Sequence, residues 1–158
     1  MRFLYQSTSF SHIDVGNYLE ELTSHICDTY AGLDQEIELQ THFEDIQLNI
    51  NQAVPLGLIM NEILANTIEH GFGLTDSGVI TIAMHESDEQ IFLMIEDNGK
   101  GSTEEIRQIT SSESTGSAIV GALIQQLGAE LNIENTDGIK LSLSFQKSDA
   151  AGSSNARL

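Results

Sequence analysis

The sequence is poor in the residues that mark secreted, disulfide-bonded or membrane-spanning proteins. Cys27 is the only cysteine, which excludes an intrachain disulfide and a cysteine metal cluster and favours a reducing, cytoplasmic setting. No apolar run is long enough to span a bilayer, and the first residues do not have the pattern of a signal peptide. The 158 residues, 40 % of them hydrophobic, are expected to form one domain with a core of ordinary composition.

Positive charge is also scarce. The chain has 24 acidic residues against 6 lysines and arginines, a formal net charge of −18, so nucleic acid is not expected as a partner. Solubility or a salt-rich habitat would account for the acidic excess by itself. Between residues 3 and 139 the only fixed positive charges are Lys100 and Arg107. A polyanion bound in this region would meet those two cations, and a metal ion would have to supply the remaining charge.

The pattern of apolar residues predicts a mixed α and β domain. Helical spacing predicts helices over residues 13–31, 53–72 and 115–128, with Asp14 as the N-cap of the first and Pro55 in the first turn of the second. Alternation predicts strands over residues 36–45, 46–51, 79–87, 90–97, 130–135 and 139–145. Because most of these strands form hairpins, we expect an α+β fold: a mixed, mainly antiparallel sheet with helices on one face.

The helix predicted over residues 53–72 has two contrasting faces. One face is apolar, and the other carries Glu62, Asn66, Glu69 and His70. A solvated helix face would explain this pattern, although asparagine has a poor helix propensity. The alternative is a binding site, in which the amide oxygen of Asn66 ligates a hard cation such as Mg²⁺ and Glu62, one turn earlier, accepts a proton.

Asp97 ends an apolar strand and is followed by two closely spaced glycines. Asp-Asn-Gly is a favourable turn sequence, so Asp97 is either a turn former or a buried hydrogen-bond acceptor. Gly99 and Gly101 would let the backbone approach a planar ligand closely. A buried carboxylate there can accept a hydrogen bond from an exocyclic amine, such as that of adenine.

Small residues open the third predicted helix. Thr115, Gly116, Ser117 and Ala118 stand at its start, where free N–H groups and the helix dipole favour an anion. Ordinary capping by serine or threonine would explain the same residues.

The order of these elements resembles a known family. A helix with Glu-x-x-x-Asn is followed by a hairpin ending in Asp-x-Gly-x-Gly, by a loop, and by a glycine-opened helix before a final hairpin. The chain resembles, over about residues 3–146, the ATP-binding domain of sensor histidine kinases, within the GHKL or Bergerat-fold ATPases. VPLGLIMNEILANTIEHGF is similar to the N box, IEDNGKG to the G1 box, and STGSAIVGALIQQLGAEL to a reduced G2 box. FLYQSTSFSHIDVGNYLEEL resembles the segment that joins the dimerisation helix to the catalytic domain in the HisKA_2 subgroup.

The resemblance implies a two-layer α/β sandwich that binds ATP and Mg²⁺. It implies that Asn66 coordinates the Mg²⁺ that bridges the ATP phosphates, that Glu62 is the catalytic base or polariser at the γ-phosphate, and that Asp97 accepts from the adenine amine. Residues 98–115 would form the lid over the nucleotide. The nucleotide-binding residues that it implies are Asn66, His70, Asp97, Gly99, Lys100, Gly101, Thr115, Gly116 and Ser117.

The resemblance also implies a domain organisation and partners. Residues 1–12 would end a linker from a dimerisation domain missing from the chain, residues 13–147 would form the ATP-binding domain, and residues 148–158 a disordered tail. The phosphoacceptor histidine would lie on that dimerisation domain, and a response regulator would receive the phosphoryl group. Dimerisation is expected only in the full-length protein, and the domain is expected to be cytoplasmic or the cytoplasmic part of a membrane-linked sensor.

Three positions depart from the family pattern and leave alternatives open. Glu69 stands where the N box often has a cation, Ala118 replaces a glycine of the G2 box, and Ile139 stands where a threonine often supports the adenine. A degenerate module that keeps the fold but acts through protein contacts would account for these changes. An anti-sigma-factor type serine kinase is the other alternative, because ANTIEHGF resembles that group as well.

Overall fold

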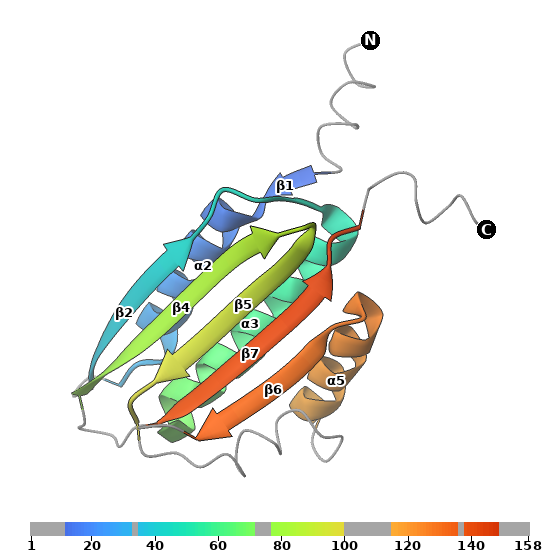
Figure 1. Ribbon diagram of the computed structural model, residues 1–158. Helices are drawn as coiled ribbons and strands as arrows, with labels where there is room; N and C mark the ends of the chain where they lie inside the picture. The colour runs from blue at the N-terminus through green and yellow to red at the C-terminus, as the bar shows by residue number, and fades with distance from the viewer. Residues whose placement is uncertain (1–11, 33–34, 72–76, 100–114, 136–137, 149–158) are drawn as a thin grey trace.

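The domain has two layers, with a sheet on one side and helices packed on the other (Figure 1). The computed structural model describes residues 12–32, 35–71, 77–99, 115–135 and 138–148. The elements are β1 (His12–Asp14), α2 (Val15–Tyr30), β2 (Glu36–Phe43), β3 (Gln47–Asn49), α3 (Ile50–Gly71), β4 (Ser77–Ser87), β5 (Gln90–Asp97), α5 (Thr115–Leu127), β6 (Glu130–Asn135) and β7 (Ile139–Gln146).

The main sheet has five strands in the order β2-β4-β5-β7-β6. Strands β2 and β4 are parallel, and the other neighbouring pairs are antiparallel. Strands β1 and β3 form a separate antiparallel pair in which His12 lies opposite Asn49. The predicted α+β fold with a mixed, mainly antiparallel sheet is therefore confirmed.

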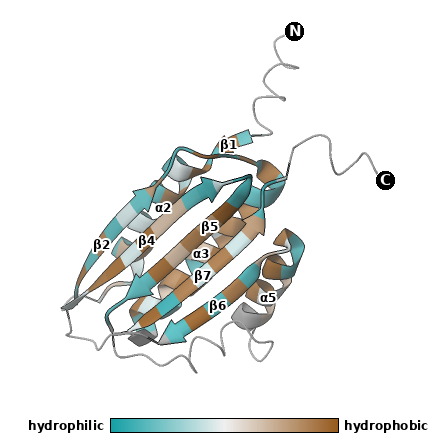
Figure 2. Cartoon of the chain, in the orientation of Figure 1, coloured by the Kyte–Doolittle hydropathy of each residue, from teal (hydrophilic) through white to brown (hydrophobic). Residues whose placement is uncertain are grey.

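The core lies between the sheet and the helices. Alternate residues of the central strands, such as Ile82, Ile95 and Leu141, point into it and are almost fully buried, and Figure 2 shows this alternation of hydropathy along the strands. The apolar face of α3 fills the other side, as the helical spacing predicts. Its buried members include Leu56, Met60, Ile63, Leu64, Thr67 and Ile68.

The start of α3 differs from the prediction. Residues 46–51 were expected to form a strand and the helix to begin at residue 53, but the strand covers only Gln47–Asn49 and α3 begins at Ile50. Asn49 caps the helix, because its Oδ1 accepts a hydrogen bond from the N–H of Asn51 at 2.8 Å. The prediction of Pro55 in the first turn is thus wrong: Pro55 lies further inside the helix, where it leaves the carbonyl of Asn51 without its usual helical donor.

The first predicted helix also changes at its start. Residues 12–14 form strand β1, and α2 begins at Val15 instead of at residue 13. The predicted N-cap is confirmed: the side chain of Asp14 accepts hydrogen bonds from the N–H of Asn17 at 3.4 Å and from its Nδ2 at 2.8 Å.

Candidate functional site

The ends of two helices and two strands lie together at one end of the sheet. The carboxyl ends of α3 and β5 and the amino ends of α5 and β7 all lie at the lower end of the view in Figure 1. The antiparallel pairing of β5 and β7 brings the end of one beside the start of the other, with Glu96 opposite Lys140. The three motifs singled out in the sequence therefore belong to elements that end or begin in the same region.

Asp97 is a buried acceptor at this end. Its side chain is 6 % exposed, and its Oδ1 accepts a hydrogen bond from the N–H of Gly99 at 2.8 Å. Burial raises the pKa of Asp97 above its ordinary value, and the negative charge of Glu96 adds to this shift. The backbone N–H groups of Gly99 and Ile139 act in the opposite direction by donating to the carboxyl group.

Asn98 extends the pairing of β5 with β4 at the end of the sheet opposite to the hairpin turn between these strands. The side-chain Oδ1 of Asn98 accepts from the N–H of Val79 at 2.8 Å, and the N–H of Asn98 donates to the Val79 carbonyl at 3.3 Å. Asp97 itself starts the turn that follows, because its Oδ1 accepts from the N–H of Gly99 two residues on. Asp97 is therefore both a turn former and a buried acceptor, the two interpretations that its sequence position allowed.

Gly138 packs directly against Asp97, and the sequence interpretation missed this contact. A Cβ added to Gly138 would lie 2.8 Å from Oδ1 of Asp97 and 2.7 Å from its carbonyl carbon, and closer still to its carbonyl oxygen. Any side chain would therefore displace Asp97. The sequence signal is Asp137-Gly138, a common turn pair between the strands predicted over residues 130–135 and 139–145, and the glycine directly precedes the strand that pairs beside Asp97.

Glu62 and Asn66 form a pair on α3. The Nδ2 of Asn66 donates to the carbonyl oxygen of Glu62 at 2.7 Å and to its carboxylate Oε2 at 3.0 Å. Both side chains are half-buried. Because the amide nitrogen is directed at Glu62, the Oδ1 of Asn66 remains the oxygen that can ligate a cation.

The other predicted site residues are described only in part. Gly99 is buried beside Asp97, whereas Lys100 and Gly101 lie outside the described residues. Thr115, Gly116 and Ser117 form the first turn of α5, and His70 belongs to the last turn of α3; the side chains of these four residues lie outside the description.

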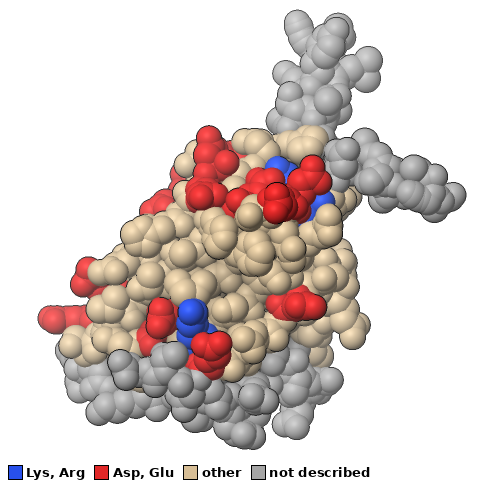
Figure 3. All heavy atoms as spheres, in the orientation of Figure 1, with Lys and Arg blue, Asp and Glu red and all other residues tan. Residues whose placement is uncertain are grey.

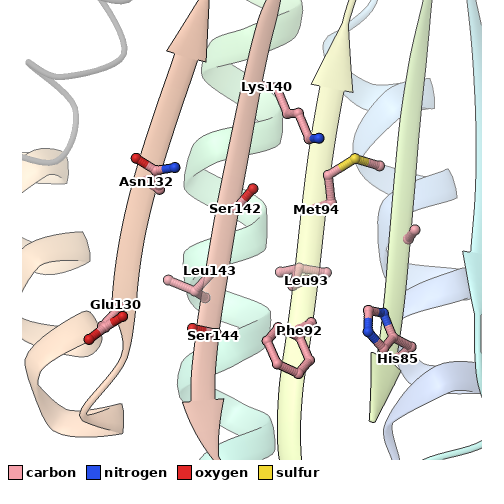
Figure 4. Close-up of a pocket in the computed structure, with 11 residues that line it drawn as sticks. His85, Phe92, Leu93, Met94, Glu130, Asn132, Lys140, Ser142, Leu143 and Ser144 are labelled. Atoms are coloured by element: carbon pink, nitrogen blue, oxygen red, sulfur yellow. The ribbon is translucent and has the colours of Figure 1, made fainter. Parts of the chain in front are cut away.

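A separate hollow lies on the face of the sheet that points away from the helices (Figure 4). It has a volume of about 400 Å³ and is lined by residues of β4, β5, β6 and β7, including Met94, Lys140 and Ser142. The rings of His85 and Phe92 stack at one side, with centroids 5.0 Å apart and planes 16° apart. Acidic side chains gather toward the two ends of this face and leave much of its middle uncharged (Figure 3). Asp97 is not among the residues that line the hollow.

The described residues contain no group of three or more histidine, cysteine, aspartate or glutamate side chains that could hold a metal ion by themselves. Within the same part of the chain, no helix combines the length and apolarity needed to cross a bilayer.

Comparison with known proteins agrees with this geometry. Residues 51–149 match the family described as Histidine kinase-, DNA gyrase B-, and HSP90-like ATPase. The chain is 31 % identical over 122 residues to blue-light-activated histidine kinase 2 of Erythrobacter litoralis, which covers 77 % of this chain and 34 % of that protein. It is 27 % identical over 151 residues to the sensor protein LytS of Oceanobacillus iheyensis, covering 87 % of this chain and 25 % of that protein.

A solved structure has the same fold. The histidine kinase domain of the Erythrobacter litoralis EL346 blue-light activated histidine kinase superposes with a TM-score of 0.73 at 27 % identity, covering 85 % of this chain and 62 % of that one. The chain spans about a third and a quarter of the two curated kinases that it matches. The family match extends over more than half of the sequence, so the chain belongs to the histidine kinase-, DNA gyrase B- and HSP90-like ATPases, with the ATP-binding domains of histidine kinases as its relatives.

Proposed function

We propose that this domain binds Mg-ATP and delivers the γ-phosphate to a histidine on a dimerisation domain, as the catalytic domain of a two-component sensor histidine kinase. Membership of the ATPase family supports nucleotide binding, and the named relatives support the kinase. The observation that carries the proposal is the buried carboxyl group of Asp97, which lies at the end of the sheet where α3, the helix of the Glu62–Asn66 pair, also ends.

Asp97 is proposed to recognise the base. Its carboxyl group is fixed by backbone donors from Gly99 and Ile139, so its orientation is set before a ligand arrives. An ionised carboxylate accepts from the exocyclic amine of adenine, and guanine offers a carbonyl oxygen at the equivalent position. The site is therefore expected to prefer adenine. Gly138 packs so closely against Asp97 that a side chain at this position would displace the carboxyl group.

The phosphates are proposed to lie between α3 and α5. The first turn of α5 supplies free backbone N–H groups that favour negative charge. From the family resemblance, His70, Lys100, Gly101, Thr115, Gly116 and Ser117 are proposed as further nucleotide contacts. The chain's formal charge of −18 makes charge neutralisation at the triphosphate essential.

The donor set fits Mg²⁺. Magnesium is commonly held by one or two protein oxygens, with substrate phosphates and waters completing its octahedral shell. The Oδ1 of Asn66 offers such an oxygen, whereas a self-sufficient metal cluster is not found in the described part of the chain. When bound, the ion supplies neutralisation of phosphate charge.

Glu62 is proposed as the residue that polarises or deprotonates the incoming nucleophile. The hydrogen bond from Asn66 fixes its carboxylate on the polar side of α3. A histidine nitrogen attacks the γ-phosphorus, and the bond between this phosphorus and the bridging oxygen of ADP breaks. The domain contributes positioning and charge stabilisation to this reaction.

The kinase proposal includes a partner on each side of the reaction. We propose that residues 1–12 end a linker from a histidine-containing dimerisation domain of the HisKA_2 type, and that a response regulator takes the phosphoryl group. Residues 13–147, which follow this linker, would be the catalytic domain. A serine acceptor on an antagonist protein would identify the anti-sigma-factor alternative, and failure to bind adenine nucleotides would identify the degenerate module.

Titration with ATP, with and without Mg²⁺, tests the nucleotide site. Asn66→Ala removes the proposed ligand, and we expect the Mg-ATP affinity to fall by more than about 100-fold, since loss of an outer-shell group alone costs metal sites about 10–100-fold. Asn61→Ala is the matched control, because it removes the same amide group from the same helix one residue before Glu62. Isothermal titration calorimetry gives both affinities. Equal affinities in the two variants would reject the assignment of Asn66.

A further inference from the structure

The outer surface of the helical layer carries a row of exposed apolar side chains on α3. On α3, Ile50, Val54 and Leu58 are 40 %, 45 % and 51 % exposed, and their spacing of four residues puts them on one side of the helix. We name these three residues the apolar stripe. Tyr18 of α2 borders it, because its hydroxyl group occupies the space where a side chain of Gly57 would lie. Exposed apolar surface of this kind marks an interaction site.

The stripe is uncharged in a strongly acidic protein. The chain has 24 acidic residues, yet α3 contains none from Ile50 to Asn61, and no lysine or arginine either. The surface therefore suits an apolar partner with few charges. A second copy of the chain would bring another formal charge of −18, which opposes self-association through this surface.

The chain itself reaches the domain beside the stripe. Strand β1 is paired with β3 so that His12 lies opposite Asn49, and α3 begins at the next residue, Ile50. The chain therefore enters the described domain at His12, next to the first residue of the stripe.

The preceding segment has the composition of an occupant. Residues 1–11, MRFLYQSTSFS, contain no acidic residue and one cation, Arg2, together with Phe3, Leu4, Tyr5 and Phe10. Eleven residues can reach at most roughly 36–40 Å when extended. The stripe covers nine residues of helix, and its first and last residues are about 12 Å apart along the axis, so the segment is long enough to cover it.

We propose that the apolar stripe is the docking surface for residues 1–11 of the same chain, with Phe3, Leu4, Tyr5 and Phe10 as the docking side chains. This inference does not depend on the proposed kinase function. Glu62 occupies the next position of the same four-residue spacing after Leu58. Docking therefore connects the segment that precedes the domain with the helix that carries the candidate catalytic residue.

A double-mutant cycle in the full chain tests the docking. The first variant combines Phe3→Ser, Leu4→Ser and Tyr5→Ser, the second is Leu58→Ser, and the third combines all four changes. We expect the first and second variants each to lower the urea midpoint by roughly 0.5 M. The third is expected to fall no further than the larger single effect, because the same contact is lost in each.

Ile119→Ser is the matched control. Ile119 is 52 % exposed and belongs to α5, a helix that begins at the opposite end of the sheet from β1 (Figure 1), so its change should add fully to that of the segment variant. Amide chemical shifts of Ile50–Leu58 should move in the segment variant and remain in place in Ile119→Ser. Full additivity between Leu58 and the segment would overturn the proposal. A concentration-dependent dimer that Leu58→Ser dissociates would overturn it too, because the occupant would then be a second copy.

Discussion

The two ends of the main sheet hold their polar groups in different ways. At the end where β4 turns into β5, Lys147 Nζ lies 3.4 Å from Glu86 Oε1, and Gln52 donates to the carbonyl of Gln146 and accepts from the N–H of Ser148, both at 2.9 Å. At the other end, no ion pair among the described residues involves Asp97, whose carboxyl group accepts from backbone N–H groups alone.

We interpret this difference as a division between contacts that stabilise the fold and groups that are available to a ligand. At the first end, polar side chains satisfy each other and fasten the end of β7 to α3 and β4. At the second end, burial opposes the ionised form of the Asp97 carboxyl group. On α3, which ends in the same region (Figure 1), Asn66 donates to Glu62 through its Nδ2, so these hydrogen bonds do not use its Oδ1. Buried charge without a countercharge reduces stability, and such arrangements are typical of binding and catalytic sites.

The strongest test of the comparison is a side chain at Gly138. Gly138→Ala places a Cβ against the backbone and Oδ1 of Asp97, so the start of β7 or Asp97 must move. We expect the free energy of unfolding to fall by about 1–3 kcal/mol, the usual cost of overpacking, and the ATP affinity to fall as well. Urea unfolding and calorimetric titration measure the two quantities.

Gly128→Ala separates site damage from general destabilisation. Gly128 has a φ of 66° after the end of α5, where an added Cβ would meet no atom within 4 Å. The strained backbone should cost about 1–2 kcal/mol, while ATP affinity stays at the wild-type value. Equal loss of ATP affinity in both glycine variants would show that Gly138 has no special relation to the site.

Asp97→Asn tests whether the buried carboxyl group of Asp97 reduces the stability of the folded protein. The raised pKa means that the ionised carboxyl group destabilises the folded state at neutral pH, so the asparagine variant should have a higher free energy of unfolding at pH 7. The wild-type protein gains stability as the pH falls through the raised pKa, and the advantage of the variant should shrink in that range. Asp45→Asn, at an exposed position, controls for the change in net charge.

The same titration has the opposite effect on binding. Adenine needs an ionised acceptor, so ATP affinity of the wild-type protein should fall as the pH decreases through the pKa of Asp97, whereas Asp97→Asn should bind weakly with little dependence on this group. Adenine recognition should suffer more than phosphate recognition. If Asp97→Asn bound ATP at pH 7 with the same affinity as Asp45→Asn, the role of Asp97 would be contradicted.

Local pattern was sufficient for the elements and for part of the site. The 3.6-residue period places Glu62 and Asn66 on the same side of α3, and the run from Ile91 to Ile95 indicates that Asp97 ends a buried strand. Both are properties of neighbouring residues. For that reason the helix face and the burial of its apolar residues agree with the prediction.

What the sequence interpretation missed depends on contacts between distant segments. Strand β1 forms only because His12–Asp14 meets Gln47–Asn49, and this pairing, together with the cap at Asn49, starts α3 at Ile50. Gly138 gains its importance from Asp97 on a neighbouring strand. The periodicity of apolar residues within one segment does not predict a contact with a distant segment. The nucleotide contacts of Lys100 and Gly101 stay predictions, because these residues lie outside the described part of the chain.

Lys147→Ala at the opposite end should have the smallest effect. The side chains of Lys147 and Glu86 are 29 % and 28 % exposed, so water screens their pairing, and we expect a loss of about 0.2–1 kcal/mol in the free energy of unfolding. Raising the salt concentration from about 0.1 M to about 1 M shortens the screening length from about 10 Å to about 3 Å, which should remove most of that loss. ATP affinity should not change, since the pair belongs to the end that fastens the fold. A loss of ATP affinity in Lys147→Ala comparable to that in Gly138→Ala would mean that the two ends are energetically coupled, and the division between stabilising contacts and groups kept for a ligand would no longer hold.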